Sequence, residues 1–193
     1  MVLAVVTRAP LPEMTPEKLA LVRVKVCEPS VPVARVPAPV RFLTVLLKPL
    51  TQAERDGDTI LAVIRGYAEN HGGMSTSLTA PNPKAQASLI VEAHRNAMFD
   101  PRSVGYVECH GTGTALGDPI EINGLKMAFE VLHRRAGIAM PDAAYCGLGS
   151  VKSNIGHAET AAGIAGVIKA VLAIRNRQLY RTLHCDEINP MIE

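Results

Sequence analysis

Two segments of the sequence share a pattern that restricts the fold: an apolar stretch, a loop containing glycine, and a run that favours a helix. In the first segment, VGYVEC ends at the Cys109-His110 corner, and a helix is expected to open at Asp118-Pro119. In the second, YCGLGSV leads into a loop at 152–157, and a helix is predicted over 159–176. Strands and helices that alternate in this way favour a layered α/β domain.

The chain between residues 43 and 98 continues this alternation. The stretches LTVLLKPL and TILAVIRGYAEN have the composition of strands, and the polar sequence AERDGD between them predicts a turn. A helix is predicted next, with Asn82 as its N-cap and Pro83 at its first helical position. The apolar residues on one face of this helix are Leu89, Ile90, Ala93, Ala97 and Met98.

The first 42 residues differ in composition from the rest of the chain. They contain no glycine and no aspartate, whereas prolines and alternating valines are frequent. Three interpretations are open. The LVRVKV stretch is a half-exposed strand that the prolines confine to a sheet edge, the segment is a low-complexity linker, or it is a misframed translation of a GC-rich gene. We assign no function to residues 1–42 and expect the fold to occupy residues 43–193.

The charged residues nearly cancel. Lys and Arg number 20 against 18 Asp and Glu, which gives a formal net charge of +2, and aromatic residues make up 4% with no tryptophan. This balance argues against binding to nucleic acid or to an anionic membrane surface. The scarcity of aromatic side chains argues against a stacking platform for bases.

The cysteines indicate a reducing environment. Cys27, Cys109, Cys146 and Cys185 form no C-x-x-C pair, so neither a zinc ribbon nor a redox dithiol is indicated. No secretion signal is visible, and the longest apolar helix candidate is shorter than a membrane span and contains Lys169. We therefore expect a cytoplasmic protein.

The first glycine-containing loop, HGTGTALG, carries candidate catalytic groups. Gly111 and Gly113 let the backbone adopt conformations closed to other residues, and Thr112 and Thr114 add hydroxyl groups. A histidine on such a loop, here His110, can donate a hydrogen bond to a developing oxyanion or transfer a proton near neutral pH.

The second loop adds Lys152 and His157, followed by a helix rich in alanine and glycine that we expect to be buried between layers. Either histidine alone is more often structural than catalytic, but two histidines and a lysine on comparable loops favour a shared site. Asp118 and Glu121 have a simpler explanation, because D-x-x-E resembles a capping box and acids favour a helix N-terminus.

The stretches VECHGTGTALGDPIEI and GSVKSNIGHAETAAGIAGVIK resemble the two signature stretches of the C-terminal half of β-ketoacyl synthases (ketosynthases). Supporting matches are VLLKPLTQAERDGDTILAVIRG, LTAPNP and Asn189-Pro190, so the resemblance covers about residues 43–193. LLKPL, AERDGD and the NHGG sequence at 70–73 are more similar to modular polyketide synthases than to stand-alone fatty-acid enzymes. The resemblance implies the C-terminal half of a thiolase-like fold with α-β-α-β-α layers.

The resemblance also implies a decarboxylative Claisen condensation, in polyketide or fatty-acid biosynthesis. His110 and His157 match the two family histidines that hydrogen-bond the malonyl thioester oxygen as the enolate forms, and Lys152 matches the lysine of the same site. Thr112 and Thr114 match threonines near the phosphopantetheine arm. No cofactor is expected to bind directly, because the resemblance implies that acyl carrier protein supplies the phosphopantetheine.

The same resemblance assigns Asp118 and Glu121 to acids that flank the site and pair with Lys152. The implied partners are acyl carrier protein, the N-terminal ketosynthase half and a second copy of the parent enzyme, with neither nucleic acid nor membrane.

The family nucleophile, a cysteine in a serine-rich elbow upstream of the HGTGT loop, has no match in this chain. Cys27 has no elbow around it, and the other three cysteines are better explained as small buried residues. We therefore expect the chain alone to be inactive in condensation, and poorly soluble unless a partner covers its apolar surface. The rival hypothesis is a degenerate remnant or an interaction half-domain.

Two other site types are weaker alternatives. Gly111, Gly113 and Gly117 follow a strand and precede a helix, but their spacing is one residue longer than the dinucleotide-binding fingerprint. A metal site formed by Cys109, His110, Cys146 and His157 matches no zinc-ligand spacing, so no metal is expected.

Overall fold

The computed structural model describes residues 19–27, 42–74 and 81–192. The strands are β1 (Leu19–Cys27), β2 (Phe42–Pro49), β3 (Ala62–Ile64), β4 (Tyr106–Glu108) and β5 (Gly147–Gly149). The α-helices are α1 (Leu50–Arg55), α2 (Pro83–Ala97), α3 (Gly117–Ala136), α4 (Lys152–Ile155) and α5 (Ala162–Asn176). Short 3-10 helices occupy η1 (Pro101–Ser103) and η2 (Glu159–Ala161).

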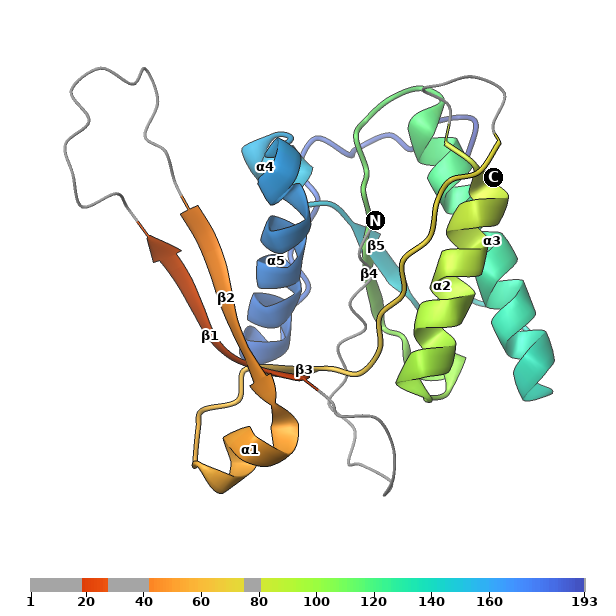
Figure 1. Ribbon diagram of the computed structural model, residues 1–193. Coiled ribbons are helices and arrows are strands. Elements are labelled where there is room, and N and C mark those ends of the chain that lie inside the picture. Colours follow the sequence, from red (N-terminus) through yellow and green to blue (C-terminus); the bar gives the residue numbers. More distant parts are fainter. Residues whose placement is uncertain (1–18, 28–41, 75–80, 193) are drawn as a thin grey trace, which may run out of the picture.

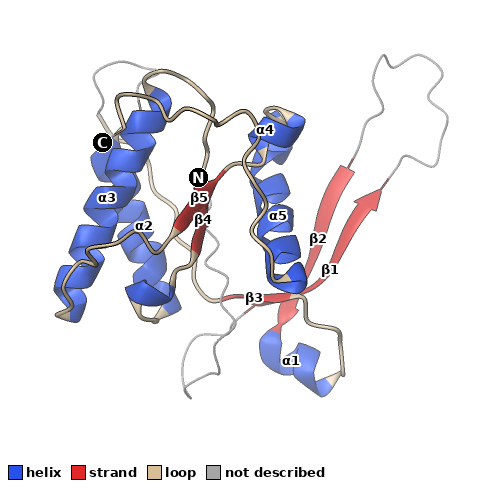
Figure 2. Ribbon diagram, turned by 180° about the vertical axis from the view of Figure 1, so that it is seen from behind, coloured by secondary structure: helices blue, strands red, loops and turns tan. Residues whose placement is uncertain are grey.

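These elements form layers in the order β–α–β–α. Both views show α2 and α3 on one side of β4 and β5, α5 on the other side, and β1 and β2 beyond α5 (Figures 1 and 2). Val171 of α5 packs with Ala62 and Val45 of the larger sheet, which fixes the position of the helix. The order contains four consecutive layers of the expected α-β-α-β-α arrangement.

The larger sheet is antiparallel with the strand order β2-β1-β3. The strand interpretation of LVRVKV is confirmed by β1, but its position differs from expectation: it lies inside the fold, and it is the central strand rather than an edge strand. The physical reason is that no proline falls between Leu19 and Cys27, so every backbone N–H group of β1 is available for pairing. Residues 1–18 and 28–41 lie outside the described residues, and their separation from the fold stays a prediction.

The smaller sheet consists of β4 and β5, which pair in parallel from Tyr106 opposite Gly147 to Glu108 opposite Gly149. The pairing extends one residue further, because the Cys109 backbone N–H donates to the Gly149 carbonyl at 2.7 Å. Parallel strands end at the same edge of a sheet. The loops that follow β4 and β5 therefore begin side by side.

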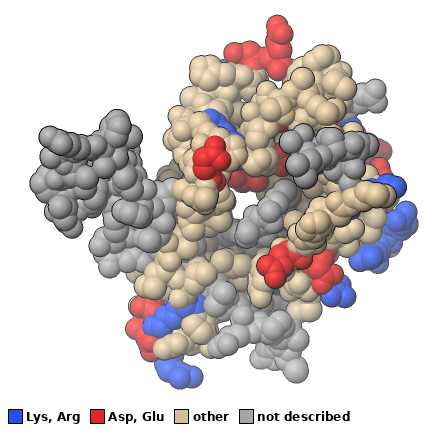
Figure 3. Space-filling model, turned by 45° about the horizontal axis from the view of Figure 1, so that its top comes forward, with Lys and Arg blue, Asp and Glu red and all other residues tan. Residues whose placement is uncertain are grey.

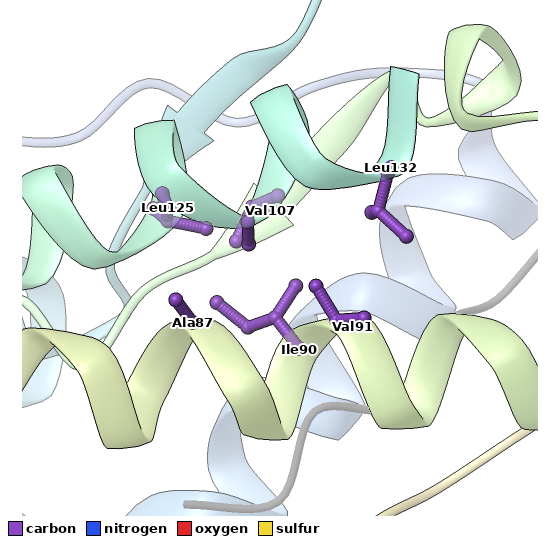
Figure 4. Close-up of a cluster of buried hydrophobic side chains, with 7 residues drawn as sticks. Ala87, Ile90, Val91, Val107, Leu125 and Leu132 are labelled. Atoms are coloured by element: carbon purple, nitrogen blue, oxygen red, sulfur yellow. The ribbon is translucent and has the colours of Figure 1, made fainter. Parts of the chain in front are cut away.

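Helices α2 and α3 pack on each other and on β4. The side chain of Asn82 caps α2 by accepting hydrogen bonds from the backbone N–H groups of Lys84 and Ala85, as the sequence predicts. The core cluster that joins the three elements is drawn in Figure 4 and contains Ala87, Ile90, Val91, Val107, Leu125, Ala128 and Leu132. Burial of this face positions β4 and hence the loop after it.

Several local predictions are wrong. Cys185 is exposed rather than buried, and the loop predicted at 152–157 contains the short helix α4. The AERDGD sequence predicts only a turn, but Ala53 to Arg55 belong to helix α1, where Leu50 and Ala53 are buried. The pattern places Met98 on the buried face of α2, but Met98 is half-exposed, because it ends the helix in the left-handed conformation (φ +48°).

Of the helices within the described residues, none is long and apolar enough to cross a membrane. Helix α5 is the most apolar candidate, and it contains the buried Lys169. The layered packing of α5 therefore accounts for its composition.

His94 of α2 makes the stability of this helix pair depend on pH. Burial lowers the pKa of His94 from its ordinary value of 6.5, with His133 adding to that effect and Asp100 opposing it. The unfolded chain therefore binds a proton at a pH where the folded chain does not, and stability is lost as pH falls through 6.5 and below.

We expect the urea midpoint of unfolding to fall between about pH 7.5 and about pH 5, and this slope to be shallower in His94→Leu. Comparing slopes rather than absolute midpoints separates proton linkage from any change in packing caused by leucine. An equal slope in the wild type and in the variant would contradict the assignment to His94.

Candidate active site

The loops after β4 and β5 bring the three predicted catalytic residues together. The ring centroids of His110 and His157 lie 5.3 Å apart with an interplanar angle of 84°. Lys152, the first residue of α4, is close enough to influence His110 electrostatically. Residues separated by more than 40 positions in the sequence thus share one site, as the sequence predicts.

His110 is held in its neutral form. Burial is the largest cause that lowers the pKa of its imidazole below 6.5, followed by the positive charge of Lys152 and a smaller effect of His157. Glu121 acts in the opposite direction. A neutral imidazole carries one N–H donor, so it can donate a hydrogen bond without giving up its proton.

The tautomer of His157 follows from its own hydrogen bond. Its Nδ1 atom accepts from the backbone N–H of Glu159 at 3.0 Å, so the ring proton is on Nε2. Glu159 adopts a left-handed backbone conformation, with φ +47°. The exposed His157 therefore presents an Nε2–H donor at the site.

Glu121 and Asp118 hold the first loop. The Glu121 carboxylate, 6% exposed, accepts from the backbone N–H groups of His110 at 2.7 Å and Gly111 at 2.9 Å. Asp118 accepts from the backbone N–H of Gly113 at 3.1 Å. These carboxylates therefore bind N–H groups of the loop rather than capping the helix. Within the described residues they also form no ion pair with Lys152, so the pairing that the resemblance implies is not found.

Ser150 joins the two loops, and sequence reasoning missed it. Its hydroxyl donates to the His110 carbonyl at 3.3 Å and accepts from the Lys152 backbone N–H at 3.3 Å. Ser150 is 6% exposed. In the sequence, Ser150 is marked only by its position between β5 and Lys152. That position does not reveal that its hydroxyl bonds a carbonyl 40 residues away.

The two threonines of the first loop are exposed and close to each other. The Thr112 and Thr114 hydroxyl oxygens lie 3.3 Å apart, and Thr114 Oγ1 accepts from the backbone N–H of Gly117 at 3.0 Å. Asn189 reaches the same loop and donates to the Ala115 carbonyl at 3.1 Å. The two threonine side chains are therefore accessible to solvent, while hydrogen bonds to Gly117 and Asn189 hold the backbone of this part of the loop.

The hydrogen bonds of this loop argue against the dinucleotide-binding alternative. A phosphate-binding loop offers free backbone N–H groups to an anion. Here those of His110, Gly111, Gly113 and Gly117 are already bonded to Glu121, Asp118 and Thr114. Two carboxylates at the same place would also repel a phosphate.

The cysteines near the site are unsuited to act as nucleophiles. Burial raises the pKa of the Cys109 thiol to about 12 and also raises the pKa of Cys146. A thiol whose pKa is raised stays protonated at neutral pH, whereas the thiolate is the reactive form. The side chain of Cys27 lies outside the described side chains. Within the part of the chain that the structure describes, no three His, Cys, Asp or Glu side chains are grouped to hold a metal ion.

Charged side chains are dispersed on the face shown in Figure 3. Lys and Arg lie in small groups near the edges, beside groups of Asp and Glu, and uncharged residues cover most of the coloured surface. This face therefore offers no broad basic surface to an anionic polymer.

The family described as "Beta-ketoacyl synthase, C-terminal domain" matches residues 61–186. Polyketide synthase PksN of Bacillus subtilis (strain 168) is 55% identical over 146 residues, which cover 76% of this chain and 3% of that protein. Polyketide synthase ThaG of Burkholderia thailandensis is 53% identical over 147 residues, which cover 76% of this chain and 2% of that protein.

Solved structures match as well. The oxazolomycin ketosynthase domain OzmH KS7 of Streptomyces albus JA3453 superimposes with a TM-score of 0.71 at 47% identity, covering 77% of this chain and 24% of that domain. The ketosynthase from module 6 of the bacillaene synthase of Bacillus subtilis 168 gives a TM-score of 0.71 at 39% identity. The match covers 77% of this chain and 25% of that ketosynthase chain. The chain thus spans about a quarter of these structures and a far smaller share of the much longer polyketide synthases.

Substitutions at Gly111 and Gly113 test the fit between the two loops. Both residues have positive φ angles, +47° and +74°, but a Cβ at Gly111 would lie 2.7 Å from Cβ of Ser150, whereas a Cβ at Gly113 meets nothing within 4 Å. We expect Gly113→Ala to cost about 1–2 kcal/mol of unfolding free energy from backbone strain alone. Gly111→Ala is expected to cost more, because Ser150 must also move.

Urea denaturation of the two variants measures the difference. Equal losses at the two positions would show that the loops are not packed as described.

Proposed function

The chain belongs to the β-ketoacyl synthase family as a C-terminal ketosynthase domain of the modular polyketide synthase type, with a thiolase-like fold, and from this membership we propose that it supplies the decarboxylating half of a Claisen condensation in polyketide synthesis. The substrate is a malonyl thioester on the phosphopantetheine arm of an acyl carrier protein. The observation that supports this most strongly is the convergence of His110, His157 and Lys152 at one edge of the β4–β5 sheet.

Decarboxylation breaks the bond between the malonyl carboxylate carbon and its α-carbon. Carbon dioxide leaves, and the electron pair passes into the thioester as an enolate whose negative charge collects on oxygen. Fixed donors aimed at that oxygen lower the barrier, and losing one such donor costs roughly 3–4 kcal/mol. The enolate carbon then attacks an acyl thioester on a cysteine of the N-terminal half, and the cysteine sulfur departs as a thiolate.

The two histidines suit this task because of their protonation. His157 offers an Nε2–H donor, since its Nδ1 atom accepts from Glu159. His110 is neutral at pH 7, because burial and Lys152 lower its pKa. Two neutral donors stabilise an enolate oxygen without protonating it. Lys152 contributes positive charge to the same site and adds to the effect of burial in lowering the pKa of His110.

Thr112 and Thr114 are proposed to contact the phosphopantetheine arm, because they are exposed on the His110 loop. The proposed partners are the acyl carrier protein, the N-terminal ketosynthase half that supplies the cysteine, and a second copy of the assembled enzyme. No cofactor is bound directly in this scheme, and the cytoplasm is its proposed location.

The first test concerns the chain alone. We expect the purified 193-residue chain to form no extended product from an acyl thioester and malonyl carrier protein, because its cysteines near the site have raised pKa values. Mass spectrometry of the carrier protein detects the product. Extension by the chain alone would contradict the assignment of the nucleophile to another segment.

The second test supplies the chain with the N-terminal half of a related polyketide ketosynthase. We expect His110→Ala and His157→Ala each to slow release of carbon dioxide from malonyl carrier protein by roughly 10²–10³-fold, while acylation of the cysteine is unchanged. His71→Ala is the matched control, because His71 is an exposed histidine whose ring accepts from Gly73 and belongs to neither loop of the site. If the histidine variants decarboxylate at the wild-type rate, the chain is a non-catalytic remnant or an interaction half-domain.

A further inference from the structure

A buried ion pair lies behind the site and takes no part in the proposed reaction. Glu108, at the end of β4, has a side chain 13% exposed, and its Oε2 atom lies 2.9 Å from Nζ of Lys169 in α5, which is 8% exposed. The Tyr106 hydroxyl donates to the same oxygen at 2.6 Å. The other oxygen, Oε1, accepts from the backbone N–H of Val151. One carboxylate therefore joins β4, α5 and the turn after β5.

Two glycines make room for this group. A Cβ at Gly166 of α5 would lie 3.1 Å from Cγ of Glu108, and a Cβ at Gly149 would lie 2.5 Å from the Tyr106 hydroxyl oxygen. The Lys169 ammonium also lies 5.6 Å from the centroid of the Tyr106 ring. The surrounding backbone is therefore fitted closely to the Glu108 carboxylate and its partners.

The hydrogen bond to Val151 connects this carboxylate to the site. Val151 directly precedes Lys152, which begins α4, and Ser150 on its other side bonds both the His110 carbonyl and the Lys152 N–H. The position of the Val151 backbone therefore determines where Lys152 stands relative to His110. The Val151 N–H satisfies the carboxylate oxygen that the ion pair leaves free, and the same bond ties the turn to the end of β4.

We propose that Glu108 is a positioning residue, which holds the Val151 turn and thereby keeps Lys152 against His110, with Lys169 balancing its buried charge. The proposal deepens the function proposed above and rests on it for its catalytic meaning. Glu108 touches neither substrate nor reacting atoms in this scheme. Its effect reaches the reaction through the placement of Lys152.

Two double variants of the full chain separate positioning from simple charge balance. Glu108→Gln with Lys169→Met removes both charges and keeps an oxygen that can accept from Val151. Glu108→Leu with Lys169→Met removes both charges and the acceptor. Neither variant leaves an unpaired buried charge, so they differ mainly in the hydrogen bond to the turn.

The readout is the titration of His110 followed by NMR, with its signal assigned by the loss of a resonance in His110→Asn. Lys152 lowers the pKa of His110, so Lys152→Met sets the full size of the upward shift that losing the lysine causes. We expect the Leu/Met variant to reproduce at least half of that shift and the Gln/Met variant to titrate close to the wild type. Urea denaturation of both variants, at the same pH, accompanies the titration.

An unchanged His110 titration in the Leu/Met variant would overturn the proposal, as would the absence of any shift in Lys152→Met. Equal shifts in the two double variants would also overturn it, since the acceptor would then be irrelevant. The titration does not require catalysis. If it follows the expectation but the assembled enzyme fails to decarboxylate malonyl carrier protein, the positioning role stands and the proposed function fails.

Discussion

Parallel pairing of β4 with β5 is the constraint on which the rest of the structure depends. It is only three residue pairs long, from Tyr106 and Gly147 to Glu108 and Gly149. Because both strands end at one edge, His110 and the Lys152 turn emerge together, although 40 residues separate His110 from Ser150. Helices α2 and α3 lie on one side of this short sheet and α5 lies on the other (Figures 1 and 2), and Val107 of β4 is buried against α2 and α3.

Buried carboxylates then hold the two loops in place. Glu121 binds the backbone of the first loop and Glu108 binds the backbone of the second, so each loop has its own acidic anchor. These anchors use backbone N–H groups, which leaves the imidazoles of His110 and His157 free to act as donors. Hydrogen bonds or a nearby ammonium offset part of the desolvation cost of each buried carboxylate.

Much of the fold could be predicted from the sequence because its signals are local. Asn82-Pro83 marks the start of α2, and the glycine-containing loops after β4 and β5 mark the site. The roles of Ser150 and Glu108 could not be predicted, because their partners lie 40 and 43 residues away. Helix capping is the best local explanation for Asp118 and Glu121, because the residue pattern does not show that the preceding loop folds back and presents its N–H groups to these two carboxylates. Helix α1 was missed because burial of Leu50 and Ala53 outweighs the turn-forming residues beside them.

Both acidic anchors, both histidines and Ser150 fall within one continuous stretch, from Glu108 to Glu159. Exchange of this stretch between related synthases would move the hydrogen bonds of both anchors together, while Tyr106, Lys169, Asn189 and the face of α2 that packs on α3 would have to be compatible in the recipient. The residues of the proposed charge-stabilising site are therefore contiguous in the sequence. Recombination boundaries placed before β4 and after α5 would preserve both the anchors and the ion pair.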